Sequence, residues 1–233
     1  ERVEAAIQAR RQVAAVVAQH HVIHIRVERG RRRRQLGLVL DLAGRAGKDE
    51  SGPLRVDELV AFDQLHYHGT EAVDEAIRAT GIHEGSSVLE IGSGLGGPAR
   101  YLAHSTGAAV TALELQEDHH LVASDLTARC GLVGSVKHLC GDFLTHPWDG
   151  ERFQAIVSWL TLYHIPQREV LLERCRSLLE VGGFVYAEDL CERRPFDDLE
   201  KEELESELFA NYLPSRDQYR LDLVAAGFEA VLL

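Results

Sequence analysis

The chain contains no methionine, few cysteines and no long apolar run. Its cysteines, Cys130, Cys140, Cys175 and Cys191, lie far apart without a C-x-x-C pair, so neither a zinc site nor a disulfide framework is expected. The longest apolar stretches are about ten residues, well below the roughly 20 that cross a bilayer. We therefore expect a cytoplasmic protein with no membrane partner and no bound metal. The absence of methionine, even at the first position, indicates either a processed chain or methionine positions missing from the sequence.

An excess of acidic residues argues against nucleic acid as a partner. The 233 residues carry a formal net charge of −12, and 45% of them are hydrophobic, which suffices for a buried core. Residues 1–50 differ from the rest, with eleven Lys and Arg against six Asp and Glu. The run Arg31–Arg34 could touch a phosphate-rich partner, but a solvated helix face is the more frequent setting of such a run.

The chain is predicted to consist of an N-terminal extension and one larger domain. Apolar residues recur at helical spacing in residues 3–24 and again in 36–42, so the first fifty residues are predicted to be helical. A linker is predicted over residues 47–53, where turn-forming and charged residues occur together. Residues 1–53 are thus a helical extension or lid, and residues 54–233 form the main domain.

Strand and helix patterns alternate along the main domain. Because the predicted strands are apolar throughout, they should be buried on both faces. This alternation predicts an α/β fold, a Rossmann-like, doubly wound, mostly parallel sheet. Strands are predicted at 87–91, 108–113, 135–139, 155–160, 183–187 and 228–233, and helices at 56–62, 71–79, 98–105, 119–130, 168–179 and 216–225, with an acidic covering helix at 199–209.

A glycine-rich loop follows the first strand of this domain. Gly92, Gly94 and Gly96 allow tight turning and close approach of a ligand to the backbone, and a proline follows in the first turn of the next helix. Gly92, Gly94 and Gly97 also match the dinucleotide pattern G-x-G-x-x-G. The loop alone leaves a nicotinamide dinucleotide and an adenosyl cofactor both open.

Of the three carboxylates near this loop, two discriminate between these ligands and Glu114 does not. Glu114 ends the second strand and can accept both ribose hydroxyls of either cofactor. Glu90 precedes the first glycine, where it would repel a pyrophosphate but suits an ammonium group. Asp142 and Phe143 follow the third strand, where they offer a carboxylate for the adenine amino group and a ring for its face.

These segments resemble the class I S-adenosylmethionine-dependent methyltransferases, from Glu90–Gly96 through Leu179–Gly183 to Ala226–Phe228. Residues 62–69 (Phe-Asp-Gln-Leu-His-Tyr-His-Gly) and the Gly-Gly-Pro-Ala-Arg sequence after the loop are similar to its small-molecule branch, notably the sarcosine and dimethylglycine N-methyltransferases. The resemblance implies S-adenosylmethionine as cofactor, S-adenosylhomocysteine as product and a small-molecule methyl acceptor. A homodimer is one compatible assembly.

The resemblance also implies a set of cofactor-binding residues. In the family, the glycine loop holds the methionine part, the residue matching Glu114 binds ribose, and the residue matching Asp142 lies at the adenine. Tyr67 would close over the methionine end. The full predicted set is Tyr67, Glu90, Gly92, Ser93, Gly94, Gly96, Glu114, Leu115, Asp142, Phe143, Ser158 and Trp159.

The chain departs from the family pattern in two places. Gln154 stands where members usually carry Asp before the fourth strand, and no counterpart of the antiparallel seventh strand follows Leu233. A missing seventh strand would leave one position in the sheet unfilled and one edge exposed.

Methyl transfer from a sulfonium is an in-line displacement that needs positioning and the exclusion of water more than covalent help. An acceptor that must lose a proton would need a base, and the histidines His164, His66 and His68 near the predicted site are the catalytic candidates. Each has a structural alternative: His164 could cap the turn after the fourth strand, and the other two could orient the lid. Trp159, Tyr163 and Tyr212 could form an aromatic wall for a cationic amine, or simply pack.

The sequence thus favours a methyltransferase acting on an amine nitrogen. An O- or C-methyltransferase of a hydrophobic metabolite is an alternative within the same chemistry, since the acceptor is not encoded in the motif. An NAD-binding oxidoreductase fits the glycines and Glu114 but leaves Glu90, Asp142 and Gly182–Gly183 without a role. A methyltransferase-like binding protein without activity is the third class.

Overall fold

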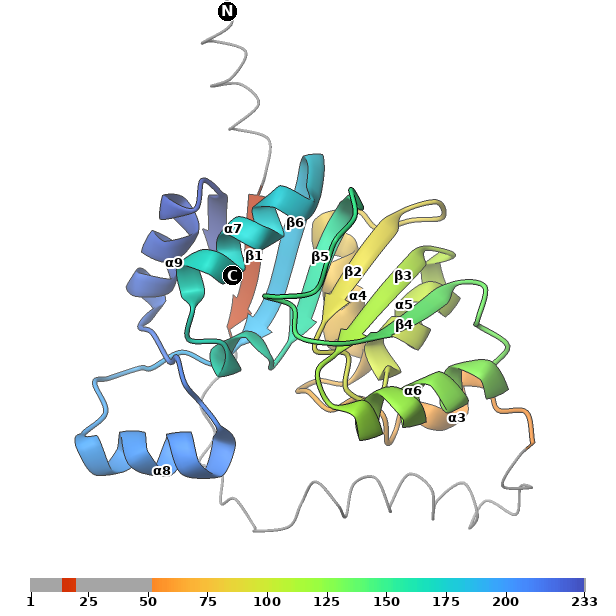
Figure 1. The fold of residues 1–233 in the computed structure, drawn as a ribbon, viewed down its shortest axis with the longest axis horizontal. Coiled ribbons are helices and arrows are strands. Elements are labelled where there is room, and N and C mark those ends of the chain that lie inside the picture. Colours follow the sequence, from red (N-terminus) through yellow and green to blue (C-terminus); the bar gives the residue numbers. More distant parts are fainter. Residues whose placement is uncertain (1–13, 20–51, 233) are drawn as a thin grey trace, which may run out of the picture.

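The computed structural model describes residues 14–19 and 52–232. These residues contain one parallel sheet flanked by helices (Figure 1). The fold is the predicted α/β class, and each predicted element from residue 54 onward is found, the strand 87–91 and the helix 216–225 with their predicted bounds and the others with shifted ends. In sheet order the strands are β4 (Val136–Cys140), β3 (Ala109–Glu114), β2 (Ser87–Ile91), β5 (Phe153–Trp159), β6 (Leu179–Asp189), β1 (Ala14–Gln19) and β7 (Glu229–Leu232).

The helices connect these strands. Gly81 and Gly107, both with positive φ, end α4 and α5, because a left-handed residue stops a helix. The described helices are α3 (Val56–Leu59), α4 (Thr70–Thr80), α5 (Gly97–Thr106), α6 (Glu117–Arg129), the 3₁₀ turn η1 (Leu162–His164), α7 (Arg168–Leu178), α8 (Asp198–Leu208) and α9 (Arg216–Ala225).

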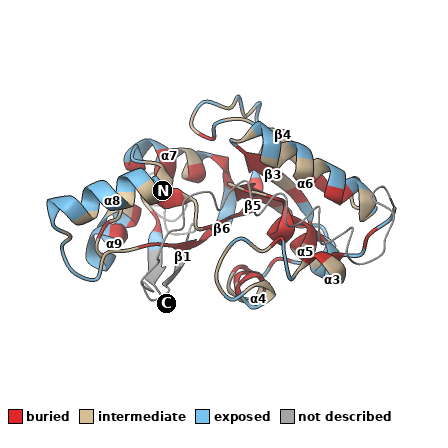
Figure 2. Cartoon of the chain, turned by 90° about the horizontal axis from the view of Figure 1, so that it is seen from below, coloured by how far each residue is buried: buried red, intermediate tan, exposed pale blue. Residues whose placement is uncertain are grey.

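The central strands β2, β3, β5 and β6 are largely buried, as apolar strands in a sheet covered on both faces require. Along β2, Val88 packs into a cluster with α4 and α5, while its neighbour Leu89 packs into a second cluster with α7 and α9. Figure 2 shows the strands largely in the buried class and α8 largely exposed. The carboxyl ends of the central strands, where the glycine loop begins, thus stand on a buried core.

Strand β1 corrects two expectations. Residues 14–19 form a strand rather than part of a helix, and β1 pairs in parallel with both β6 and β7. The position that the family's antiparallel strand would fill is therefore occupied by β1. A short apolar run such as Ala-Ala-Val-Val-Ala suits a buried strand as well as a helix, so periodicity alone could not decide. The other helices expected in the first fifty residues, and Arg31–Arg34, lie outside the described residues.

Helix α8 is the acidic cover predicted after the fifth strand of the main domain. Asp197 and Glu200 form a capping box at its start, and none of its residues is buried. It projects from the body of the domain beside the carboxyl ends of β6 and β1 (Figure 1). Within the described residues, no helix combines the length and apolar character needed to cross a bilayer.

Candidate active site

The glycine loop is held in its shape by backbone contacts. Gly92, Gly94 and Gly96 have φ of +74°, +52° and +73°, a region that glycine adopts without strain. The N–H groups of Gly92 and Ser93 donate to the Leu113 carbonyl oxygen at the end of β3. A Cβ at Gly92 would lie 2.3 Å from the Thr161 side chain. The first glycine is therefore required by both conformation and space.

Glu114 is bound to this loop. Its Oε2 accepts from the Gly94 N–H and its Oε1 from the Gln116 N–H, each at 2.8 Å. A carboxylate oxygen has more than one acceptor position, so both oxygens can also accept from ribose hydroxyls. The predicted ribose-binding role is compatible with this geometry.

The adenine-side residues divide into exposed and buried ones. Leu115 is 67% exposed directly after Glu114. Asp142 is exposed at the end of the neighbouring β4, where its side chain accepts from the Leu144 N–H. Phe143 is only 3% exposed and packs against Trp148 in the core. The ring of Phe143 therefore belongs to the core, which does not match the adenine platform predicted for it.

Buried polar atoms without partners lie at the start of the loop. Within the described residues, Glu90 Oε2, Ser93 Oγ and Trp159 Nε1 have no hydrogen-bond partner. Burial raises the pKa of Glu90 to about 8, against the opposing effect of Arg100. Unpaired buried atoms also occur far from the loop, for example Trp148 Nε1, so the lack of a partner does not by itself mark a ligand site. The Glu90 carboxyl and the Ser93 hydroxyl, which lie beside the glycine loop, fit the amino-acid end of S-adenosylmethionine.

Residues 62–69 lie directly on the glycine loop. A Cβ at Gly97 would come within 2.2 Å of the Asp63 carbonyl oxygen, and one at Gly94 within 3.4 Å of the Leu65 side chain. Asp63 also forms a buried ion pair with Arg100 of α5, with Oδ2 and Nη2 2.9 Å apart. The segment is thus fastened over the loop, where a lid is needed to exclude water.

The structure separates the two histidines of this segment. The His66 side chain is buried, stacks on Trp159 at 5.6 Å and has its Nδ1 3.9 Å from Glu188 Oε2. Tyr67 donates its N–H to Glu188 Oε1, and its ring packs against the cluster of Tyr163 and its neighbours. His68 is exposed with φ of +60°.

His164 is attached to the segment after α8. Its Nδ1 lies 2.8 Å from the Phe209 carbonyl oxygen, and the Asn211 amide donates to the His164 carbonyl. Because a carbonyl oxygen only accepts, Nδ1 carries a proton and the neutral ring has its lone pair on Nε2. This bond links η1 to the segment after α8 and does not cap the turn after β5, and it selects the tautomer that a base requires. Nearby, Ser158 Oγ donates to the Ile91 carbonyl and ties β5 to β2.

Two buried carboxylates at the end of β6, Glu188 and Asp189, are not among the site residues predicted from the sequence. Burial raises the pKa of Glu188 to about 7 and that of Asp189 to about 6. Asp189 accepts from the Tyr219 hydroxyl and the Tyr163 N–H and pairs with Arg168 at 3.6 Å. The signal available in the sequence was an acidic pair at the end of an apolar strand.

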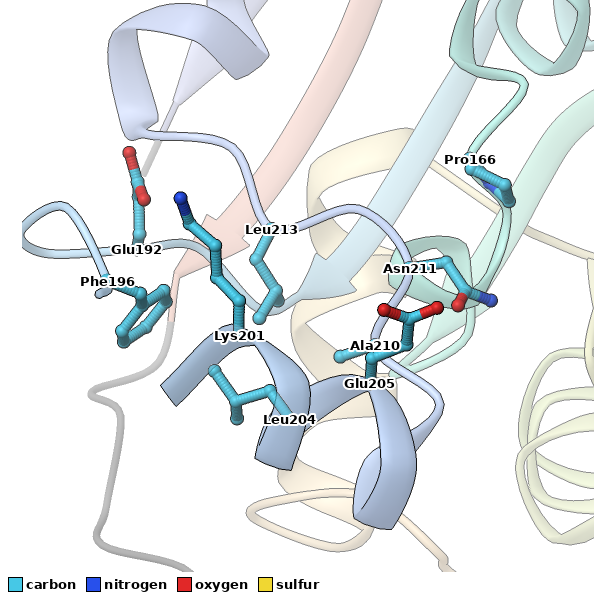
Figure 3. A pocket seen from close by; sticks show the side chains of 9 residues that line it. All are labelled: Pro166, Glu192, Phe196, Lys201, Leu204, Glu205, Ala210, Asn211 and Leu213. Carbon is cyan, nitrogen blue, oxygen red and sulfur yellow. The ribbon is translucent and has the colours of Figure 1, made fainter. Parts of the chain in front are cut away.

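A cavity of about 390 Å³ lies between α8 and the segments that follow β6 and η1. Lys201 extends from α8 toward Glu192, and Glu205 lies opposite Asn211 (Figure 3). From α8, the charged Lys201 and Glu205 and the apolar Leu204 line the cavity, and Leu213 adds a second apolar wall. In the described part of the chain, no group of three or more His, Cys, Asp or Glu residues could hold a metal ion.

Known proteins match the middle of the chain. Residues 88–183 match the family model described as a methyltransferase domain. This stretch is a methyltransferase domain. The match confirms the resemblance to methyltransferases and favours S-adenosylmethionine over a nicotinamide dinucleotide as the ligand of the glycine loop. The fold agrees with solved structures of this class.

Curated relatives of the domain act on different acceptors. The sterol 24-C-methyltransferase ERG6B of Gibberella zeae is 34% identical over 52% of the chain and 32% of its own length. The sarcosine/dimethylglycine N-methyltransferase of Halorhodospira halochloris is 32% identical over 45% of the chain and 38% of its own length. The chain thus matches only about a third of the length of either relative.

A solved structure supports the same fold. The phosphoethanolamine N-methyltransferase 2 of Haemonchus contortus, in complex with phosphomonomethylethanolamine and S-adenosylhomocysteine, superposes with a TM-score of 0.65. The alignment covers 82% of this chain and 45% of that one at 20% identity. At this identity the likeness establishes the fold of the domain.

Proposed function

We propose that the protein transfers a methyl group from S-adenosylmethionine to an amine nitrogen of a small molecule. The proposal is carried by one observation, namely the aromatic and carboxylate side chains that follow strands β5 and β6 beyond the cofactor loop. Tyr163 follows β5, and beyond the end of β6 the cavity beside α8 is lined by the Phe196 ring and the carboxylates of Glu192 and Glu205. Aromatic faces and a carboxylate attract a cationic amine, whereas a wall for a hydrocarbon acceptor would be aliphatic.

In this mechanism the bound cofactor supplies an electrophilic methyl group. The chain's own residues fasten the lid over the loop, exclude water and accept the proton that the amine must lose before it attacks. His164 is the base in this proposal, because the Phe209 carbonyl oxygen fixes its proton on Nδ1 and leaves Nε2 as acceptor.

A panel of acceptors tests the proposal. The full chain is incubated with S-adenosylmethionine and either sarcosine, dimethylglycine or phosphoethanolamine, and both S-adenosylhomocysteine and methylated product are measured. Turnover of an amine supports the proposal. Binding of S-adenosylhomocysteine without turnover of any acceptor would instead favour a binding protein.

His164→Gln should lower kcat on the amine by about 10²- to 10⁴-fold while the affinity for S-adenosylhomocysteine stays unchanged. The control is His104→Gln, which removes an exposed histidine of α5. An unchanged kcat in His164→Gln would assign the base elsewhere.

A hydrophobic acceptor is the second candidate, because aliphatic side chains gather beneath α8. Leu160, Leu190, Leu204, Leu208 and Leu213 form one cluster with Tyr67 and Tyr163. Including a sterol and squalene in the panel separates the two functions, since a C-methyltransferase would turn over these and leave the amines unchanged.

A further inference from the structure

Residues 62–69 contain a buried chain of polar groups that begins at the cofactor loop. The Arg100 Nη2 donates to Asp63 Oδ2 at 2.9 Å and to the Leu95 carbonyl oxygen of the loop at 2.7 Å. The other carboxylate oxygen of Asp63 accepts from Gln64 Nε2 at 3.0 Å. The side-chain amide of Gln64 is thereby oriented, because turning it over would bring its carbonyl oxygen against the carboxylate.

The orientation of Gln64 determines the protonation of His66. The Gln64 Oε1 lies 3.0 Å from His66 Nε2, and the Tyr67 carbonyl oxygen lies 2.9 Å from His66 Nδ1. Both oxygens are amide carbonyls, which accept hydrogen bonds and cannot donate them. Each ring nitrogen must therefore donate, and a histidine that donates from both nitrogens is an imidazolium.

Glu188 supplies the opposite charge. Its Oε2 lies 3.9 Å from His66 Nδ1, and the two side chains are 0% and 2% exposed. Trp159 covers one face of the imidazole ring. Burial raises the pKa of Glu188 to about 7, the Tyr67 N–H lowers it, and Glu75 of α4 raises it.

Other charged groups face the pair from the surrounding elements. Asp189 on β6 also raises the pKa of Glu188, and Tyr186, lower on the same strand, keeps its proton because burial raises its pKa. From the cofactor side, the pair of Asp63 and Arg100 is close to neutral overall. The surroundings of His66 are thus acidic in balance, which favours a cation there.

We propose that His66 is a positioning residue that works as a buried imidazolium, pinning residues 62–69 between the cofactor loop and the end of β6. Loss of its proton would set a nitrogen lone pair against a carbonyl oxygen and weaken the lid, so cofactor affinity should fall as the pH rises. A general base would behave in the opposite way, because it works only without the proton. The inference goes beyond the proposed amine chemistry and holds for any acceptor.

Nuclear magnetic resonance tests the protonation directly. The full chain, labelled with ¹⁵N in histidine, is recorded at pH 7.5, and the His66 signals are assigned by their loss in His66→Gln. We expect both ring nitrogens of His66 to be protonated at this pH, although it lies above the ordinary histidine pKa of about 6.5. A neutral ring with a single protonated nitrogen at pH 7.5 would overturn the proposal.

Calorimetric titration with S-adenosylhomocysteine tests the consequence. The wild type should bind about tenfold more tightly than His66→Gln at pH 6.5, and this ratio should approach one by about pH 9. Groups whose titration is not coupled to His66, Glu90 among them, cancel from the ratio. His104→Gln is the matched control and should follow the wild type at every pH. A ratio that does not change with pH would refute the role of the proton.

A charge-balanced double variant separates positioning from general damage. Glu188→Gln or His66→Gln leaves one buried charge without its partner, whereas the double variant replaces the pair by two neutral amides. We expect the double variant to bind S-adenosylhomocysteine more tightly than either single variant. Strictly additive losses would contradict the pairing. If the single variants do not fold, the double variant, which also lacks His66, supplies the assignment, and the resonance measurement on the wild type still decides. Failure of the amine proposal would show only as absent turnover.

Discussion

The cofactor side and the acceptor side of the candidate site are held by different kinds of contact. On the cofactor side, the loop after β2 is shaped by backbone N–H groups, such as those of Gly92 and Gly94. These groups donate hydrogen bonds to residues at the carboxyl end of β3. On the acceptor side, the ends of β5 and β6 are held by buried charged side chains, such as Arg168 with Asp189. The difference indicates that the cofactor side depends on space and backbone conformation, and the acceptor side on balanced charge.

The largest expected effect is on the cofactor side. Gly94→Asp forces a side chain into φ of +52° and places a second carboxylate beside Glu114. We expect the affinity for S-adenosylhomocysteine to fall by more than about 10³-fold in calorimetry, about 4 kcal/mol. Gly131→Asp is the control, because Gly131 has φ of +69° and a Cβ added there would have no atom within 4 Å. Unchanged affinity in Gly94→Asp would contradict the assignment of the loop.

The acceptor side should respond through stability. Arg168 lies over the Tyr219 ring at 4.2 Å and pairs with buried Asp189. Arg168→Met should lower the free energy of unfolding by about 3 to 5 kcal/mol, because it leaves a buried carboxylate unpaired. Arg194→Met breaks the exposed pair with Glu200 and should cost at most about 1 kcal/mol. If urea unfolding shows that Arg168→Met and Arg194→Met lose the same free energy of unfolding, the buried pair contributes no more to stability than the exposed one.

The same contrast explains what the sequence could predict. The glycine loop, Glu90 and Glu114 are close in sequence or follow successive strands, so their spacing predicts their meeting. The contact of Tyr67 with Glu188 joins residues 121 positions apart, and no local pattern encodes it. The core position of Phe143 depends on Trp148, which packs against it from the following loop. Local patterns therefore predict the fold and the cofactor side better than the acceptor side.

The burial of Glu90 predicts a pH-dependent stability. Its pKa is raised from 4.5 to about 8 by burial, so between these values the folded protein holds a proton that the unfolded chain has released. This contribution to stability is complete below pH 4.5 and is lost as the pH rises toward 8. Relative to the wild type, Glu90→Gln should therefore gain about 2 to 3 kcal/mol between pH 5 and 8. Thermal and urea unfolding of both proteins at pH 5 and at pH 8 measure this difference in stability.

The control for this pH series is Glu84→Gln, which changes an exposed glutamate at the amino end of β2. It should track the wild type across the range. A constant difference between Glu90→Gln and the wild type from pH 5 to 8 would show that Glu90 is ionised in the folded protein throughout. The carboxylate would then be available to a cationic ligand without releasing a proton.

The smallest effect is expected at Glu114, because the loop keeps other contacts when this carboxylate is lost. Glu114→Ala removes the acceptor of the Gly94 and Gln116 N–H groups together with the one proposed for ribose. The affinity for S-adenosylhomocysteine should fall by about 1 to 3 kcal/mol, measured by calorimetry. Glu117→Ala, an exposed change in the first turn of α6, should have no effect. If both variants bind alike, the ribose lies elsewhere and the cofactor side depends on the glycines alone.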